Sequence, residues 1–173
     1  MSILAIDVGK KNLGFCVYSN ECFEFGLWNM SKEIKKQSIE NRNEVIVKWL
    51  NQMIEQFKPT MIVVEQQIMN NIVAMTIQSC INTYCVINNI PYLSFRARNK
   101  FVFTGETNFD SKKKEHKKMA IQYSKNIIKE LDKTKLEEFL KYPKQDDIGD
   151  AICMALISSN YNKETLKHIM IQK

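Results

Sequence analysis

Residues 2–28 read SILAIDVGKKNLGFCVYSNECFEFGLW and contain three apolar runs separated by two short polar turns. The runs cover residues 2–8, 13–19 and 22–28. They are rich in β-branched and aromatic residues, which favour strands. Because the turns between them are so short, consecutive strands must reverse direction. We therefore expect an antiparallel three-stranded meander at the start of the chain.

Helical and apolar segments alternate after this meander, and Pro59 ends the first helix. We expect, in chain order, a helix over 38–57, a buried strand over 61–65, a helix over 69–88, a strand over 91–95, a polar basic loop over 96–110, a helix from 111, a last helix over 146–161 and a peripheral end from 162. Strands joined by crossover helices add in parallel. The sequence thus predicts an α/β fold in a single domain over 1–173. Its mixed five-stranded sheet has three antiparallel strands, then two parallel ones, and is flanked by helices.

Acidic residues follow two of the apolar runs. Asp7 ends the first run, in AIDVG, and Glu65 ends MIVVE at 61–65. Each alone has an ordinary explanation, because Asp is common in turns and a strand-end Glu can reach solvent. Carboxylates at the mouth of a core are nevertheless costly unless a cation binds them. The simplest such cation is magnesium, and the simplest chemistry for paired magnesium ions is attack on a phosphodiester.

A third acidic group lies in KQDDIGDAICMAL at 144–156. Asp147 and Asp150 stand at i, i+3 at the start of an apolar-faced helix, so they share one face. Asp146 or Asp147 can serve as a helix cap, but capping does not explain Asp150. Acids this close repel one another unless a cation neutralises them. By position we prefer Asp147 and Asp150 as metal ligands, and the role of Asp146 stays open.

Positive charge gathers in one part of the chain. The formal net charge is +6, and residues 96–118 carry eight Lys and Arg residues against three acidic ones. A local basic patch favours a polyanion such as nucleic acid. A solvated, lysine-rich loop and helix explains the charge equally well.

The cysteine and histidine content argues against several classes of protein. The five cysteines form no CxxC pair and leave one over, and no secretion signal is evident, so we expect reduced thiols in a cytoplasmic, non-secreted protein. The two histidines, His116 and His168, are too few for a zinc centre or an HNH-type nuclease. We expect His116 on a helix surface. No stretch qualifies as a membrane span.

The segment 69–88 has no charged side chain, and its apolar residues cover more than one face of a helix. One side is expected to cover the sheet. The other is expected to meet a second copy of the chain in a two-fold homodimer. A central core helix in a monomer is the alternative.

Together these motifs resemble the RuvC-type Holliday-junction resolvases of the ribonuclease-H-like superfamily, and most closely the group from poxviruses and related large DNA viruses. The resemblance covers about residues 2–161 and lies in AIDVGKKNLG, VVEQQ, SKKKEHKKMA and KQDDIGDAICMAL, in the expected order. It implies a ribonuclease-H-like fold. Two features depart from the pattern: the segment after Glu65 lacks the basic residues of some poxviral relatives, and Asp146 is an extra acid.

The resemblance also implies an activity, that of a magnesium-dependent endodeoxyribonuclease. Such an enzyme resolves four-way (Holliday) junctions and other branched DNA by paired phosphodiester hydrolysis. It implies two Mg²⁺ ions per active site, ~3.5–4 Å apart, with Mn²⁺ as a substitute. The implied ligands are Asp7 as the bridge, Glu65 on one ion, and Asp147 and Asp150 on the other ion or its waters.

The same resemblance assigns basic residues to catalysis and to DNA. Lys113 or Lys114 is expected to assist at the active site. The expected DNA contacts, mainly to backbone phosphates and without sequence readout, are Lys10, Lys11, Arg96, Arg98, Lys100, Lys112, Lys117 and Lys118. Phe101 or Phe103 is a candidate wedge against junction bases, with a core position as the alternative. A homodimer through 69–88 would supply two active sites for a substrate with two-fold symmetry.

Other functions fit parts of the pattern. Asp7, Gly9 and Gly14 match the phosphate loop of actin-like and sugar-kinase ATPases, but one lobe and five glycines are too few for that fold. A nuclease of the same fold that acts on flaps, RNA or RNA–DNA hybrids is the more serious alternative. A non-catalytic DNA-binding dimer is a third, although a binding surface would gain by losing these acids.

Overall fold

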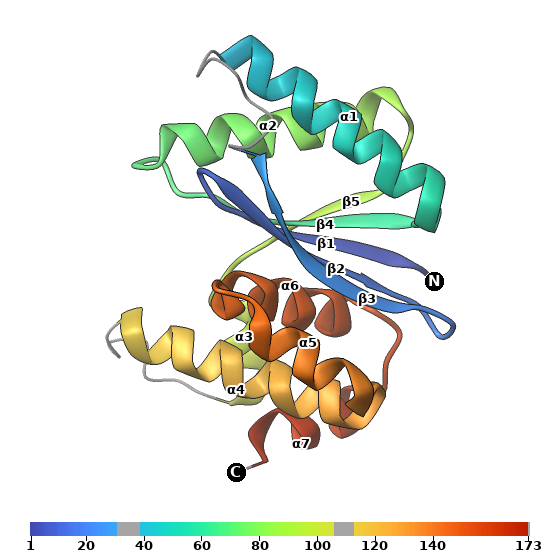
Figure 1. The fold of residues 1–173 in the computed structure, drawn as a ribbon, viewed down its shortest axis with the longest axis vertical. Coiled ribbons are helices and arrows are strands. Elements are labelled where there is room, and N and C mark those ends of the chain that lie inside the picture. The colour runs from blue at the N-terminus through green and yellow to red at the C-terminus, as the bar shows by residue number, and fades with distance from the viewer. Residues whose placement is uncertain (31–38, 106–112, 173) are drawn as a thin grey trace.

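The computed structural model describes residues 1–30, 39–105 and 113–172, without the side chains of 39, 40, 113 and 114. Five strands form one sheet in the order β3-β2-β1-β4-β5 (Figure 1). They are β1 (Ile3–Val8), β2 (Asn12–Tyr18), β3 (Phe23–Asn29), β4 (Met61–Glu65) and β5 (Tyr92–Phe95). The first three pair antiparallel, whereas β4 pairs parallel with both β1 and β5. The mixed sheet predicted from the sequence is confirmed.

Helices cover both faces of this sheet. α1 (Ile39–Phe57) and α2 (Ile72–Ile87) lie on one face, and α6 (Gln145–Ser158) lies on the other with further helices beyond it (Figure 1). Those helices are α3 (Asn99–Thr104), α4 (Lys113–Leu131), the short 3-10 helix η2 (Lys133–Lys135), α5 (Leu136–Lys141) and α7 (Lys163–Ile171). Because both faces are covered, every residue of the central strand β1 is buried.

The side chains of β1 alternate between the two layers. Its even-numbered residues pack against α1 and α2, whereas Ile3 and Ala5 belong to the core on the α6 side. Asp7 has the same parity as Ile3 and Ala5, so its carboxylate projects toward α6. In β4, Val63 lies in the α6-side core, and Glu65 follows it two residues later. The pleat of the sheet therefore sends both strand-end acids to one side.

Two expectations about the later chain were wrong. Within the loop expected over 96–110, residues Asn99–Thr104 form α3, which ends at Gly105 with a φ of 85°; 106–110 lie outside the described residues. The end of the chain is not peripheral, because α7 buries Leu166, Ile169 and Met170. These three residues have helical spacing and form one apolar stripe against the α6-side core.

α2 has two unlike faces. Its N-cap is Asn71, whose side chain accepts a hydrogen bond from the N–H of Ala74, and one face of the helix is buried against the sheet. The opposite face leaves Ile72 and Ile87 exposed at 76% and 73%. Among the described residues, no helix is both long and apolar enough to cross a membrane.

Candidate active site

Two strand ends bring carboxylates together at one edge of the sheet. β1 and β4 are parallel neighbours, with Ile6 opposite Val64 in the register. Asp7 and Glu65 are the next residues along each strand, so they leave the sheet side by side. Asp7 is buried and Glu65 half-buried.

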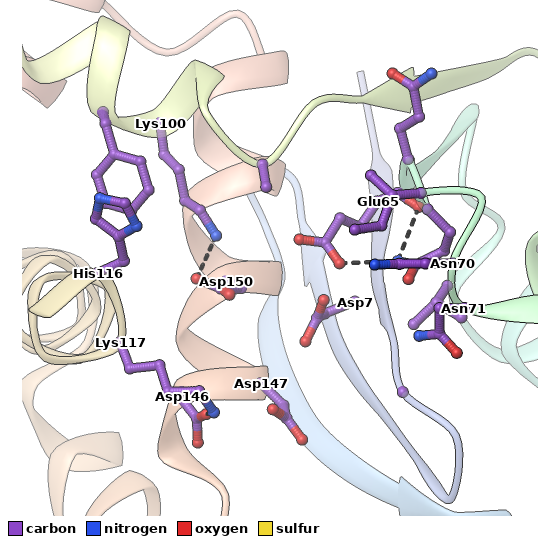
Figure 2. Close-up of a pocket in the computed structure, with 17 residues that line it drawn as sticks. Asp7, Glu65, Asn70, Asn71, Lys100, His116, Lys117, Asp146, Asp147 and Asp150 are labelled. Carbon is purple, nitrogen blue, oxygen red and sulfur yellow. Dashed lines mark hydrogen bonds and ion pairs between the residues drawn. The ribbon is translucent and has the colours of Figure 1, made fainter. Parts of the chain in front are cut away.

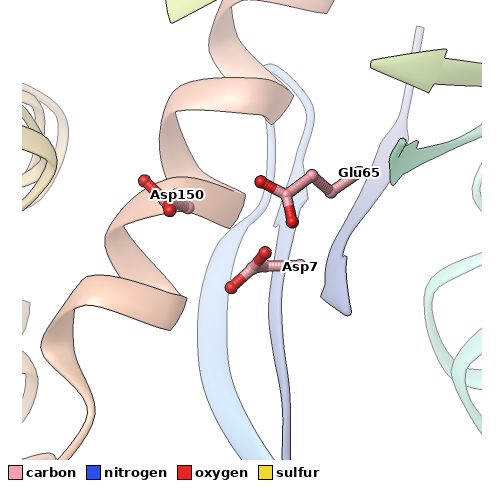
Figure 3. A group of neighbouring side chains, drawn as sticks. All are labelled: Asp7, Glu65 and Asp150. Carbon is pink, nitrogen blue, oxygen red and sulfur yellow. The ribbon is translucent and has the colours of Figure 1, made fainter. Parts of the chain in front are cut away.

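Helix α6 supplies the third carboxylate. Its first turn lies against β2 at Gly14, where a Cβ would collide with the carbonyl oxygen of Asp147, so only glycine permits this approach. Asp150 then points back at the strand ends. One carboxylate oxygen from each of Asp7, Glu65 and Asp150 lies within 4.8 Å of the others (Figure 3). Three oxygen ligands at this spacing fit a hard divalent cation.

A buried lysine completes this group. Lys100, on α3, forms an ion pair with Asp150, and the lysine side chain is only 3% exposed (Figure 2). The ammonium also lies 5.7 Å from the centre of the Phe101 ring. We call Asp7, Glu65, Asp150 and Lys100 the floor of the pocket.

Burial dominates the electrostatics of the floor. It raises the pKa of Asp7 well above its ordinary value, and the Glu65 carboxylate adds to the rise. Burial also raises the pKa of Asp150, although Lys100 opposes the rise. For Lys100, burial alone would lower the pKa, but the surrounding carboxylates, Asp150 first among them, raise it above the usual value. Among the described side chains, one lysine faces three carboxylates here, so the floor holds surplus negative charge that favours a bound cation.

The entrance of the same pocket carries a second, more open group, Asp146, Asp147 and Lys117, which we call the rim. Lys117 on α4 forms an ion pair with Asp146 on α6, and the lysine side chain is 44% exposed (Figure 2). Burial would raise the pKa of Asp146, but the hydrogen bond from Lys117 brings it below the ordinary value. Burial and the neighbouring Asp146 raise the pKa of Asp147 to about 6. Asp146 thus forms an ion pair, whereas Asp147 lines the pocket with a raised pKa that Lys144 and Lys117 only partly oppose.

A short hydrogen-bond chain orients Glu65. The side-chain amide of Gln67 donates to Oε2 of Glu65 at 2.9 Å, and the backbone N–H of Gln67 donates to Oε1 of Gln78 at 2.8 Å. Gln78 lies on α2, so this helix supports the site as well as the sheet. The sequence motif VVEQQ contains Gln67, but nothing in the sequence predicts its contact with Gln78.

His116 lines the pocket beside the floor. Its ring stacks on Phe101, with ring centroids 4.5 Å apart. Phe101 is buried, so its assignment as a wedge against DNA bases was wrong, and its alternative core position is confirmed. Phe103 is partly buried and packs against the α6-side core.

Floor, rim and neighbouring residues together line an open pocket of about 510 Å³.

Comparison with known proteins shows the family to which this chain belongs. The sequence matches the family model of the poxvirus A22 protein over residues 1–161. The chain belongs to the poxvirus A22 family. This confirms the poxviral resemblance seen in the sequence motifs.

The solved structures similar to this A22-family chain share its fold at low sequence identity. Fowlpox virus resolvase, solved with Holliday junction DNA, is 18% identical, with a TM-score of 0.67 over 96% of this chain and 99% of that one. The yeast mitochondrial Holliday junction resolvase Ydc2 is 17% identical, with a TM-score of 0.67 over 97% and 82% of the two chains. Thermus thermophilus RuvC is 15% identical, with a TM-score of 0.60 over 98% and 94%. A search of curated protein sequences finds no significant match.

The remaining residues singled out in the sequence of this A22-family chain fall into three groups. Lys10, Lys11, Arg96, Arg98 and Lys118 are exposed, and each lies within two residues of one that lines the pocket; Nε of Arg96 donates to Oε1 of Gln66 at 3.3 Å. Lys112 lies outside the described residues, as do the side chains of Lys113 and Lys114, although 113 and 114 begin α4. Lys100 differs from the expectation of a surface contact, because its side chain lies inside the pocket with Asp150.

Proposed function

We propose that this A22-family chain is a metal-dependent endonuclease that resolves four-way DNA junctions by phosphodiester hydrolysis. The observation that carries the proposal is the convergence of Asp7, Glu65 and Asp150, from two strands and a helix, within 4.8 Å of one another beside a buried lysine. A purely structural site would not bury surplus carboxylates at the bottom of an open pocket.

The donor set fits a magnesium ion better than zinc or calcium. All three converging ligands are carboxylates, and the pocket is open enough to leave coordination positions to water and phosphate. A bound Mg²⁺ would supply Lewis-acid stabilisation and an activated water at the scissile phosphate. Asp7, Glu65 and Asp150 would hold it, and Asp147 faces the same pocket as a further ligand, directly or through water.

The other residues of the pocket have distinct parts in this proposal. Lys100 compensates part of the floor's negative charge and keeps Asp150 aimed at Asp7 and Glu65. As a buried cation at the floor, it is also suited to contact the scissile phosphate. Gln67 fixes one carboxylate oxygen of Glu65, so the other stays directed into the pocket. Lys113 or Lys114, at the start of α4, stays a proposed aid to catalysis.

The proposed substrate is branched DNA. Two similar structures, of fowlpox virus resolvase and T. thermophilus RuvC, are described as complexes with Holliday junction DNA. Around the pocket of this chain, exposed Lys and Arg residues from the β1–β2 turn, the start of α3 and α4 offer contacts to backbone phosphates. Lys10, Arg98 and Lys118 are examples. The cytoplasm is the proposed location, since all five cysteines are free thiols.

We also propose that the active form is a homodimer through α2. The exposed apolar residues Ile72, Val86 and Ile87 lie on this helix, next to a groove of about 580 Å³ between α1 and α2. A two-fold dimer would cover this surface and supply the two active sites that paired incision needs. Ile87→Glu is expected to turn the dimer into a monomer in sedimentation equilibrium. A wild-type chain that sediments as a monomer at micromolar concentration would contradict the dimer.

The test of the proposed function is a comparison of substrates. Purified protein is incubated with labelled four-way junction, flap, RNA–DNA hybrid and linear duplex, with Mg²⁺ or with chelator. We expect symmetric paired nicks in the junction, only with the metal, and little cutting of linear duplex. Preferential cutting of the flap or the hybrid would favour the alternative nuclease, and binding without any cutting would favour a non-catalytic DNA-binding dimer.

A further inference from the structure

Lys117 and Asp146 form a pair that the proposed chemistry does not use. Asp146 is the acid that departs from the family motif, and it lies at the rim with Lys117 as its partner. The two residues come from different helices, α4 and α6. They line the same pocket as the three converging carboxylates.

The spacing of the two helices is fixed close to this pair. Gly149, on α6, faces α4, and a Cβ there would lie 2.8 Å from Oγ of Ser124 and 3.0 Å from the carbonyl oxygen of Ala120. These contacts are tighter than a side chain tolerates, so glycine lets α4 and α6 touch. Lys117, one turn before Ala120 on α4, is thereby held within reach of the first turn of α6.

An unpartnered lysine at this place would interfere with metal binding. Lysine is a flexible cation with a four-carbon stem, and 44% of the Lys117 side chain is exposed. Asp147, the next residue after Asp146, lines the same pocket (Figure 2). Without Asp146, the ammonium of Lys117 would pair with the pocket's remaining carboxylates, because opposite charges at short range attract strongly there. It would then compete with a divalent cation for the same oxygens.

We infer that Asp146 is a positioning residue that holds Lys117 away from the metal-binding carboxylates and is not itself a metal ligand. The inference rests on the proposed metal site. It explains how a third acid can stand directly beside Asp147, because this acid has a cationic partner of its own. Lys100 needs no such device, since its buried stem fixes its ammonium on Asp150.

A double-mutant cycle with Mn²⁺ as the probe tests this inference. Free Mn²⁺ is measured by electron paramagnetic resonance during titration of DNA-free protein, for wild type, Asp146→Asn, Lys117→Met and the double variant. We expect Asp146→Asn to weaken Mn²⁺ binding by about three- to tenfold, and Lys117→Met to bind at least as tightly as wild type. In the Lys117→Met background, Asp146→Asn should have no further effect. Glu44→Gln is the matched control, because it neutralises the acid of the exposed Lys48–Glu44 pair on α1 and should change nothing.

Each other outcome has a definite meaning. An equal loss of affinity from Asp146→Asn in both backgrounds would show that Asp146 acts on the ion itself, and would overturn the inference. So would wild-type affinity in the Asp146→Asn variant. Asp146→Glu, which keeps a carboxylate at the rim, should stay near wild type. If wild type binds no Mn²⁺, or Asp7→Asn binds it equally well, the proposed metal site fails, which is a result distinct from failure of the rim inference.

Discussion

The floor and the rim of the pocket are each built around a lysine–aspartate pair, yet the two pairs differ in physical character. Lys100 and Asp150 at the floor have side chains that are 3% and 22% exposed, whereas Lys117 and Asp146 at the rim are 44% and 15% exposed, so the difference lies in the two lysines. A buried pair is fixed and costly to break, because removing one partner leaves an unpaired charge in the protein interior. A pair open to solvent is screened and contributes little to stability. Similar residue types therefore form a rigid centre and an adjustable entrance a few residues apart.

The largest expected effect comes from the floor. Asp7→Asn removes the buried carboxylate at which two strands and α6 meet, so we expect junction cleavage to fall by at least about 10³-fold. Metal-independent junction binding should persist. Cleavage of labelled junction and gel-shift binding in chelator measure the two effects separately. Loss of binding together with cleavage would count against a metal role for Asp7.

Removing the floor lysine tests how much the buried Lys100–Asp150 pair contributes to stability. Lys100→Met should lower the free energy of unfolding by about 3 kcal/mol at pH 7, because Asp150 loses its buried partner. The loss should be smaller at pH 5 than at pH 7, because burial already raises the pKa of Asp150 and the substitution removes the lysine that opposes this rise. Chemical denaturation at both pH values measures this, with Lys117→Met as the matched rim variant. Equal losses for the two variants would erase the distinction between floor and rim.

The rim acid Asp147 gives a smaller, pH-dependent effect. Its folded-state pKa of about 6 lies above the value of an unfolded Asp, so the folded state binds the proton more tightly. Metal-free protein should therefore lose stability as pH rises from ~4 through ~6. Asp147→Asn removes this loss, and at pH 7 in chelator the variant should exceed wild type by about 1 kcal/mol, after allowance for solvent screening. Melting curves at pH 4 and pH 7 test it, and a difference that is larger at pH 4 would contradict the assignment.

The smallest effect is expected at the rim lysine. Lys117→Met should change the free energy of unfolding by less than about 1 kcal/mol, since its pair is partly exposed. If Lys117 contacts a phosphate in the complex, the slope of log K against log salt for junction binding should fall by about 0.9. Filter binding at several salt concentrations measures this slope, and an unchanged value would remove Lys117 from the DNA interface.

The sequence predicted the floor carboxylates because their positions follow from simple rules. Acids at the ends of two parallel strands meet at the same sheet edge, and an i, i+3 pair on a helix shares a face. Asp7, Glu65 and Asp150 therefore come together as expected. Asp147 shares the pocket with them but lies at the rim, outside the three that converge.

Lys100 shows the limit of this approach. Within a basic segment, the net charge cannot reveal which lysine side chain is buried. In addition, α3 has only six residues, which is too short for the apolar periodicity that predicts a helix. The same holds for Gln67 and Gln78, whose hydrogen bond joins the loop after β4 to helix α2. Contacts of this kind depend on how elements pack, which local periodicity does not encode.

The alternation of side chains along β1 makes this strand intolerant of insertions. An extra residue inserted in β1 before Asp7 would move every following side chain to the opposite layer, because the repeat of a strand is two residues. Aliphatic residues such as Leu4 and Ile6 could exchange layers at modest cost, but Asp7 would enter the dry layer beneath α1 and α2. The number of residues in β1 before Asp7 therefore determines both whether the core packs correctly and whether Asp7 reaches the site. We expect length variation among related chains to avoid this strand and to gather in loops.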